Sequence, residues 1–288
     1  MNGSRGRDYL ASFYREEQRF GPESGTELPR FQPETLPACV IGHQQIVPIR
    51  YSYPLRFFEI RFAMASQSTI VFDLDGTLVD TAPDLINALN FILDREGLAP
   101  VPLHAARNMI GAGARKLLER GLELEGRTVS LAELARLTDD FIAYYAEHIA
   151  DASLPFDGLE AALDALAGSG YRLAVCTNKL EWLSKLLLDR LNLSSRFAAI
   201  CGADTFGVAK PDPGILRQTV VRAGGQLASA IMVGDAGTDI GVARRAGVPV
   251  IGVSFGYTEV PIAELKPDRL IHHMAELQQA VASLVSQS

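Results

Sequence analysis

Cysteines and long apolar runs are both scarce in this sequence. Its 288 residues contain only three cysteines, Cys39, Cys176 and Cys201, which are far apart and odd in number. Two of them lie in apolar segments, a pattern that favours buried, reduced thiols over disulfides or a zinc site. No apolar stretch approaches the roughly 18–20 residues that a membrane-spanning helix requires. We therefore expect a soluble protein of a reducing compartment, the cytoplasm, with no membrane partner.

A concentrated block of positive charge is also lacking. The formal net charge is −7, and acidic residues are spread along the chain, which argues against nucleic acid as a partner. The length allows one large or two medium domains, and a hydrophobic content of 48% allows a sizeable core. A monomer and a homodimer both stay open.

The first 63 residues contain no lysine, although they include eight arginines and seven acidic residues. They show no sustained helical or alternating pattern, so we expect an N-terminal extension, residues 1–63, that is poorly structured. Organelle presequences are also rich in arginine, but they are poor in acidic residues, which disfavours that interpretation. Two explanations stay open: synthesis that begins at Met64, directly before the first strand, or a genuine disordered tail.

After Met64, apolar runs alternate with segments of helical spacing, in the order expected of a parallel sheet with right-handed crossovers. This pattern predicts an α/β fold with a doubly wound parallel sheet. The predicted strands are 69–73, 171–176, 197–201, 229–234, 248–253 and 268–271, and the predicted helices are 158–168, 180–191, 213–223, 237–246 and 273–286.

One connection is too long for an ordinary crossover. The roughly 80 residues that follow the first strand show only helical patterns, at 84–96, 103–109, 113–121 and 130–149. We predict a separate helical cap, residues 83–153, on an α/β core formed by residues 64–82 and 154–288. Because the cap leaves the core just after the first strand and returns near Leu154, its two linkers can act as hinges for a lid.

Two carboxylates follow the first predicted strand. Asp73 and Asp75 come directly after the apolar run of residues 70–72. Residues i and i+2 of a strand point the same way, so we expect both carboxylates to face one point at the carboxyl edge of the sheet, where open α/β folds bind ligands. An ordinary turn is the alternative, since Asp and Gly are common in turns.

Polar residues follow three further strands at the same predicted edge. Thr177 and Asn178 follow the second strand and can donate hydrogen bonds to an anion, although a helix cap is the alternative for the threonine. Lys210 precedes a Pro-Asp-Pro helix start after the third strand. Asp235 and Asp239 follow the fourth strand, at a loop-to-helix junction where an aspartate is often only a cap.

Together these residues indicate a magnesium site for phosphoryl transfer. Several carboxylates at one sheet edge are electrostatically unfavourable unless a cation lies among them. Mg²⁺ is the hard ion that a few carboxylates, a substrate phosphate and water hold. With Lys210, Thr177 and Asn178 to bind the phosphoryl oxygens, the site suits phosphoryl transfer, in which positioning and charge stabilisation supply most of the catalysis.

The ordered set of motifs resembles the haloacid dehalogenase superfamily over about residues 69–275. The resemblance implies a Rossmann-like core, Mg²⁺ as the cofactor and Asp73 as a nucleophile that forms an aspartyl-phosphate. It also implies that Asp75 protonates the leaving oxygen and then activates water, while Thr177 and Lys210 bind the phosphoryl group.

The same resemblance implies the metal ligands. These are Asp73, the backbone carbonyl of Asp75, and Asp235, with Asp239 in support. The sequence departs from the motif at Ala236, where many relatives carry a hydroxyl, so we expect that loop to be supported differently.

The helical insertion resembles the small cap of superfamily members that act on small molecules, which implies a small phosphorylated metabolite as the partner. Residues 110–118, within the insertion, and residues 79–85, near its start, resemble bacterial phosphoglycolate phosphatases, which implies hydrolysis of 2-phosphoglycolate to glycolate and phosphate. A Gly-x-Gly that opens a helix exposes backbone N–H groups to an anion. Gly113 and Arg115 are therefore candidates for binding the substrate carboxylate, with an ordinary tight turn as the alternative.

Other functions remain alternatives. A phosphomutase of the β-phosphoglucomutase type would use the same aspartyl-phosphate but return the group to a sugar, and a related phosphatase could act on pyrophosphate or a sugar phosphate. A dehalogenase is disfavoured because that reaction has no leaving alkoxide for Asp75 to protonate. A non-catalytic binding module is disfavoured because the nucleophile and the metal-binding acids are all present.

Overall fold

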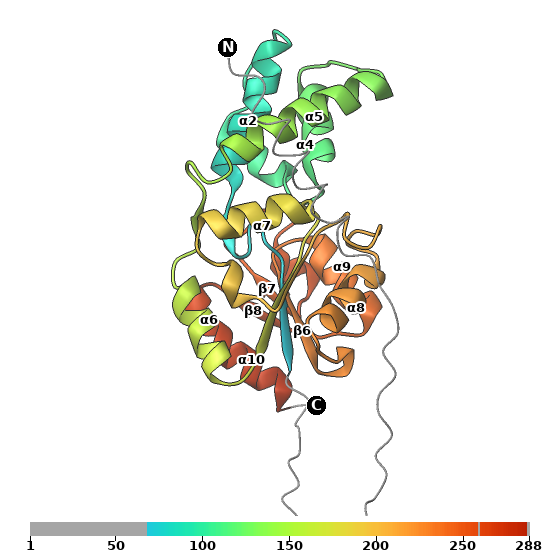
Figure 1. Ribbon diagram of the computed structural model, residues 1–288. Helices are drawn as coiled ribbons and strands as arrows, with labels where there is room; N and C mark the ends of the chain where they lie inside the picture. Colours follow the sequence, from blue (N-terminus) through green and yellow to red (C-terminus); the bar gives the residue numbers. More distant parts are fainter. Residues whose placement is uncertain (1–67, 259, 287–288) are drawn as a thin grey trace, which may run out of the picture. The chain divides into compact units, whose positions relative to one another are not determined.

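A six-stranded parallel sheet forms the centre of the computed structural model, which describes residues 68–258 and 260–286 (Figure 1). The predictions for residues 1–63 and for Cys39 lie outside the described residues. The strands stand in the order β5-β4-β1-β6-β7-β8, and each neighbouring pair is parallel. The expected α/β class with a doubly wound sheet is confirmed. The strands are β1 (Thr69–Phe72), β4 (Arg172–Cys176), β5 (Ala199–Cys201), β6 (Ala230–Gly234), β7 (Val250–Val253) and β8 (Arg269–Ile271).

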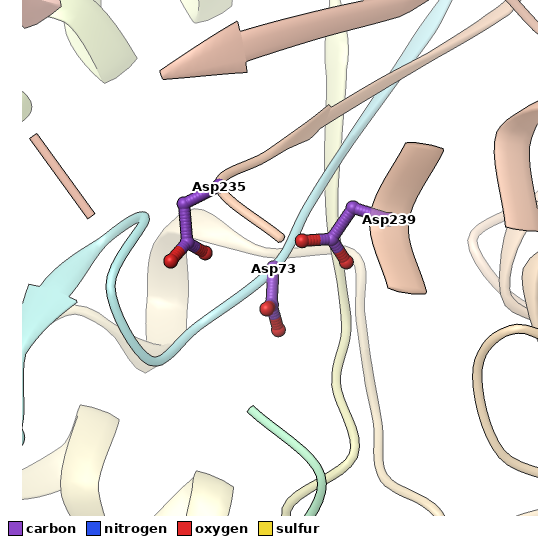
Figure 2. A group of neighbouring side chains, drawn as sticks. All are labelled: Asp73, Asp235 and Asp239. Carbon is purple, nitrogen blue, oxygen red and sulfur yellow. The ribbon is translucent and has the colours of Figure 1, made fainter. Parts of the chain in front are cut away.

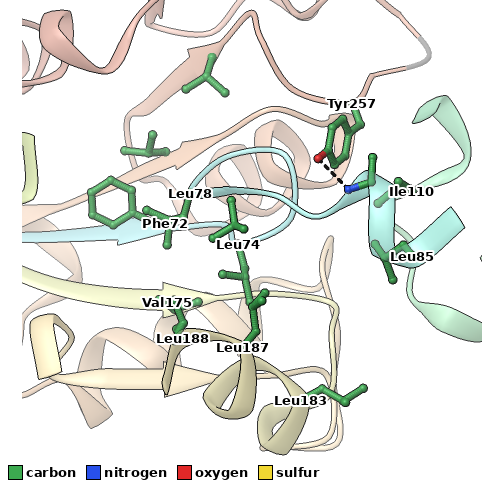
Figure 3. Close-up of a cluster of buried hydrophobic side chains, with 14 of the residues drawn as sticks. Phe72, Leu74, Leu78, Leu85, Ile110, Val175, Leu183, Leu187, Leu188 and Tyr257 are labelled. Carbon is green, nitrogen blue, oxygen red and sulfur yellow. Dashed lines mark hydrogen bonds between the residues drawn. The ribbon is translucent and has the colours of Figure 1, made fainter. Parts of the chain in front are cut away.

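Helices cover both faces of this sheet because its strands are apolar on both sides. In β1, Ile70 and Phe72 belong to the hydrophobic cluster on one face, whereas Val71 belongs to the cluster on the other. Figure 3 shows part of the first cluster, in which Val175 lies beside Leu187 and Leu188 of helix α7. The first face carries α6 (Leu159–Gly168), α7 (Glu181–Arg190) and α10 (Leu277–Val285), and the second carries α8 (Pro213–Arg222) and α9 (Gly237–Ala246).

The long connection after β1 is helical, as predicted. Its helices pack on one another, and their buried faces are continuous with the first cluster. They lie beyond the carboxyl ends of the strands in Figure 1. The boundaries of a cap at residues 83 and 153 stay a proposal. The elements are α2 (Ala82–Arg95), α3 (Leu103–Ala106), η2 (Arg107–Met109), α4 (Ala114–Leu124) and α5 (Leu131–Glu147).

The two linkers of this helical segment pair with each other. Strands β2 (Val79–Asp80) and β3 (Leu154–Pro155) form a short antiparallel ladder. The sequence did not predict these strands, because two residues are too few to show a strand period. The ladder holds the chain together at the point where the helical segment leaves and returns.

A buried carboxylate strengthens this junction. Asp84, in the first turn of α2, is 1% exposed and accepts hydrogen bonds from the backbone N–H groups of Ala152 and Ser153. It also accepts one from the Ser153 hydroxyl, at 2.6 Å. The start of the helical segment is therefore bonded directly to its return linker.

Within the part of the chain that the structure describes, none of the helices combines the length and the apolar character that crossing a membrane requires. Cys176 and Cys201 are free thiols, buried opposite each other on β4 and β5. Burial raises the pKa of the Cys176 thiol to about 12, so it stays protonated and unreactive.

We expect Asp84→Asn to lower the free energy of unfolding by about 1–3 kcal/mol, because the amide presents a donor to groups that are themselves donors. Asp94→Asn is the matched control, since Asp94 lies on the same helix but is exposed. Denaturant titration of both variants measures the difference, and equal stabilities would show that the carboxylate does not hold the junction.

Candidate active site

Three aspartate side chains converge where β1 and β6 end (Figure 2). Asp73 directly follows β1, Asp235 directly follows β6, and Asp239 lies in the first turn of α9. Each offers one carboxylate oxygen, and these three oxygens lie within 4.8 Å of one another. Strands β1 and β6 are neighbours at the point where the strand order reverses, which is the usual ligand site of doubly wound folds.

Lys210 neutralises part of this charge. Its ammonium lies 2.8 Å from Asp73 Oδ1 and 2.6 Å from Asp239 Oδ1, and its side chain is 0% exposed. The Asn178 side chain holds the lysine backbone at both ends, since it accepts from the Lys210 N–H and donates to the Lys210 carbonyl. Lys210 and Asn178 are therefore both at the site, but the asparagine amide is engaged in positioning the lysine.

The carboxylates strongly affect one another's protonation. Burial raises the pKa of Asp73 to about 7; Lys210 lowers it and Asp239 raises it further. Burial also raises the pKa of Asp235, and the charges of Asp239 and Asp73 add to that effect. Burial opposes the charge on Lys210, but Asp239 and Asp73 outweigh it and raise the pKa of the ammonium. The group of acids is thus under-neutralised by protein cations alone.

Two hydrogen bonds hold the Asp235 carboxylate. Its Oδ1 accepts from the Thr77 hydroxyl at 2.9 Å, and its Oδ2 accepts from the Tyr257 N–H at 2.6 Å. The turn that brings Thr77 here requires Gly76, which has a φ of +84°. A Cβ on this glycine would lie 2.5 Å from Asp235 Oδ2.

Tyr257 also joins this residue to the linkers. Its hydroxyl accepts from the Ala82 N–H at 3.1 Å, as Figure 3 shows, and hydrogen bonds to Asp80. Asp80 in turn pairs with Arg107 at 2.6 Å. A chain of direct contacts therefore runs from Asp235 to the helical segment.

Asp75 has different surroundings from Asp73. The predicted strand 69–73 ends at Phe72, so the strand period does not extend to Asp73 and Asp75, although both line the same cavity. The Asp75 carboxylate accepts from the Thr81 hydroxyl at 2.7 Å and pairs with Lys179 at 2.9 Å. The three-aspartate group contains Asp239 and not the side chain of Asp75, whose predicted metal contact is its backbone carbonyl and stays a prediction.

Sequence reasoning missed two residues beside Asp75. The Lys179 side chain is 5% exposed, and its ammonium donates a hydrogen bond to the hydroxyl of Tyr145, on α5, at 3.1 Å. Burial opposes its charge, but Asp75 and Tyr145 outweigh burial and raise the pKa of Lys179, while burial raises the pKa of Tyr145 to about 12. Lys179 directly follows Asn178, which is a signal that could have found it, whereas no motif marks Tyr145.

Side chains of the core and of the helical segment together line a cavity of about 220 Å³. Its volume is below the roughly 300–1,000 Å³ of pockets for drug-sized ligands, so it suits a small substrate. The hydroxyl of Thr177 accepts from the Lys179 N–H and keeps its own proton for another acceptor. The core contributes Asp73, Asp75, Thr177, Asn178 and Lys179 to the lining, and the helical segment contributes Ile110, Gly111, Gly113, Arg115 and Tyr145.

Both predicted carboxylate-binding residues line this cavity. Gly113 is the N-cap of α4, with a φ of +89°, and Asn178 donates to the nearby Gly111 carbonyl at 3.2 Å. Arg115 is half-exposed and pairs with Glu119 at 3.3 Å. The arginine therefore lies at the cavity but has a competing partner.

The structure accounts for the alanine at position 236. Ala236 is the N-cap of α9 and has no side-chain acceptor, but its N–H donates to Asp239 Oδ2 at 3.0 Å. Asp239 therefore supports this loop as well as pairing with Lys210.

The donor set fits a divalent cation. Four carboxyl and two ammonium groups of the described residues meet here, so that with every group ionised the site carries two uncompensated negative charges. Carboxylate oxygens are the ligands that Mg²⁺ prefers. A divalent cation among Asp73, Asp235 and Asp239 would balance the charge and offset the effect of burial.

Comparisons with known proteins agree with this geometry. Residues 70–253 match the family model described as haloacid dehalogenase-like hydrolase. The chain is 47% identical to a phosphoglycolate phosphatase of Caulobacter vibrioides over 219 residues, which are 76% of this chain and 92% of that protein. It is 45% identical to a phosphoglycolate phosphatase of Agrobacterium fabrum, over 73% of this chain and 91% of that protein.

A solved structure shows the same fold. The crystal structure of a predicted phosphoglycolate phosphatase from Haemophilus somnus aligns with a TM-score of 0.70 and 29% identity, over 75% of this chain and 99% of that chain. The chain belongs to the haloacid dehalogenase-like hydrolase family. The expectation of a phosphoglycolate phosphatase-like hydrolase is thereby confirmed.

We expect Mg²⁺ to stabilise the protein, because a ligand that binds only the folded state raises its stability. At a Mg²⁺ concentration 100 times the dissociation constant, the melting temperature should rise by roughly 5–10 °C. Asp235→Asn should remove most of this rise, whereas Asp157→Asn, at an exposed carboxylate, should keep it. Thermal denaturation with and without Mg²⁺ tests this, and an equal rise in both variants would place the cation elsewhere.

Proposed function

We propose that this protein is a Mg²⁺-dependent phosphatase that hydrolyses a small phosphate monoester, 2-phosphoglycolate, through an aspartyl-phosphate. The observation that supports it is that the two aspartates of one motif have different surroundings. Asp73 and Asp75 line the same cavity, but each has its own buried lysine, and only Asp73 belongs to the three-aspartate group. Two carboxylates in different surroundings can take two different roles.

Asp73 is the nucleophile in this proposal. Its Oδ1 is fixed by the Leu74 N–H at 2.7 Å and by Lys210 at 2.8 Å. An Asp73 oxygen attacks phosphorus, the bond from phosphorus to the ester oxygen breaks, and the leaving oxygen takes the electron pair. The Thr177 hydroxyl donates a hydrogen bond to a phosphoryl oxygen, and Lys210 screens the repulsion between the carboxylate and the phosphate.

Asp75 handles the proton. It gives its proton to the leaving oxygen, so that an alcohol departs, and the resulting carboxylate then takes a proton from water as that water attacks phosphorus. This second step releases phosphate and restores both aspartates. Thr81 and Lys179 hold the carboxyl group of Asp75 at the cavity throughout.

The residues that would hold Mg²⁺ are Asp73, the backbone carbonyl of Asp75, and Asp235, with Asp239 beside them. When bound, the ion supplies charge stabilisation to the transferring phosphoryl group. Asp239 fixes Lys210 and the start of α9, and is therefore a positioning residue.

The cavity and the relatives support the choice of substrate. The volume of about 220 Å³ under the helical segment admits a small metabolite and excludes bulky protein substrates. Gly113 and Arg115 offer a helix N-terminus and a positive charge to a substrate carboxylate. The curated relatives named above carry the name phosphoglycolate phosphatase.

We expect Asp73→Asn to abolish turnover, lowering kcat by at least about 10³-fold, because an amide cannot form the acyl phosphate. The fold should persist, as circular dichroism can show. Asp189→Asn, at an exposed position of α7, is the control that should keep full activity. Phosphate release from 2-phosphoglycolate with Mg²⁺ is the measurement, and substantial activity of the Asp73 variant would contradict the assignment.

We expect Arg115→Ala to raise KM for 2-phosphoglycolate more than KM for a phosphate ester that lacks a carboxylate. The guanidinium is partly engaged by Glu119 and partly solvated, so the expected rise is about 2- to 5-fold. Lys116→Ala is the matched control, because Lys116 pairs with the same glutamate but does not line the cavity. Steady-state kinetics with both esters decide, and equal changes would remove Arg115 from substrate binding.

A further inference from the structure

The buried pair of Lys179 and Tyr145 faces the cavity, and the mechanism above uses only the contact of Lys179 with Asp75. Both residues line the cavity, Lys179 from the core and Tyr145 from α5. The lysine donates to the tyrosine hydroxyl at 3.1 Å, and its ammonium lies 4.7 Å from the centre of the ring. Because the hydroxyl accepts this bond, it retains its own proton for a further acceptor.

We propose that Lys179 and Tyr145 bind the substrate carboxylate and restrict the substrate to esters whose carboxylate is attached to the carbon that bears the ester oxygen. This inference rests on the proposed function, because it takes Asp75 as the group that meets the ester oxygen.

The position of Lys179 relative to Asp75 carries the argument. The ammonium lies 2.9 Å from Asp75 Oδ1, about the length of one hydrogen bond. An ester oxygen that accepts a proton from Asp75 must lie within a similar distance of the same carboxyl group. In a 2-phospho carboxylate, two covalent bonds join that oxygen to the carboxylate carbon. The carboxylate therefore falls beside Lys179.

Burial makes Lys179 a stronger anchor than Arg115. The Lys179 side chain is 5% exposed, and its partners Asp75 and Tyr145 themselves line the cavity. The Arg115 side chain is 56% exposed and pairs with Glu119, which is not part of the lining. A charge-assisted hydrogen bond is stronger where water is excluded. Arg115 is thus suited to attracting the substrate at the cavity, and Lys179 to holding it in position.

The surroundings of the pair explain the limit on chain length. The ring of Phe141 stacks 6.1 Å from that of Tyr145 and lines the same cavity, as do Leu117 and Leu183. One additional methylene would move the carboxylate away from the ammonium and against apolar side chains, which is unfavourable for an unpaired charge. Tyr145 belongs to the helical segment, so this contact forms only when the segment covers the core.

Three esters and three variants test the proposal. The esters are 2-phosphoglycolate, ethyl phosphate, which lacks the carboxylate, and 3-phosphooxypropanoate, whose carboxylate is one methylene further away. The variants are Lys179→Met, Tyr145→Phe and the control Lys116→Met, at a lysine on α4 outside the cavity lining. Steady-state kinetics give kcat and KM for each combination.

For Lys179→Met we expect kcat/KM to fall about 100-fold for 2-phosphoglycolate and less than about tenfold for ethyl phosphate, because only the first loses a charge-assisted contact. Tyr145→Phe should raise KM for 2-phosphoglycolate about 3- to 10-fold and KM for ethyl phosphate less than about 2-fold. The wild-type protein should prefer 2-phosphoglycolate to its longer homologue, and Lys116→Met should behave as wild type.

An equal loss on both two-carbon esters would overturn the inference, since Lys179 would then act only through Asp75, while the proposed function would stand. A wild-type preference for 3-phosphooxypropanoate would overturn it as well. Failure of the wild-type protein to hydrolyse any of the esters would overturn the proposed function itself. If Lys179→Met does not fold, Tyr145→Phe, which keeps the charge and the ring, still decides.

Discussion

The buried ion pairs of Lys210 with Asp73 and Asp239 are the interaction on which the rest of the site depends. They bring residues from three segments of the chain to one edge of the sheet, where β1 and β6 end side by side. Removing one partner of such a buried pair leaves an uncompensated charge, which is strongly unfavourable. Asn178 holds the lysine backbone, and Asp239 also accepts a hydrogen bond from the Ala236 N–H at the start of α9. The position of Asp73, the proposed nucleophile, is therefore set by the core of the fold and not by a loose loop.

The motif that contains Asp73 and Asp75 gives its two acids different environments. Asp73 lies with two other aspartates and one lysine, so a cation bound among them would offset the excess negative charge. Asp75 lies between a threonine hydroxyl and Lys179, whose other partner is a tyrosine of the helical segment. The proposed mechanism assigns proton transfer and nucleophilic attack to groups that face the same small cavity. The helical segment takes part directly, because Tyr145 and Gly111 contact core residues of the site.

The six main strands and most of the helices could be predicted because apolar periodicity and glycine breakers mark them clearly. The short ladder of β2 and β3 could not, since two-residue strands carry no period. The motifs identified Asp73, Lys210 and Asp235 because each follows a buried strand. Their spacing could not show that Asp75 turns toward Lys179, or that Tyr145, some 70 residues along the chain, reaches the same lysine. Such contacts depend on how the helical segment packs on the core.

In the proposed mechanism, Asp73 accepts a phosphoryl group beside a divalent cation. A crystal structure obtained with Mg²⁺ and beryllium fluoride, a mimic of a phosphoryl group, tests it most directly. We expect the fluoride complex to attach to a carboxylate oxygen of Asp73, with Mg²⁺ held by Asp73 and Asp235 and with Lys210 and Thr177 bound to the fluorides. Attachment to Asp75 or to another residue, or a cation bound away from Asp73 and Asp235, would contradict it.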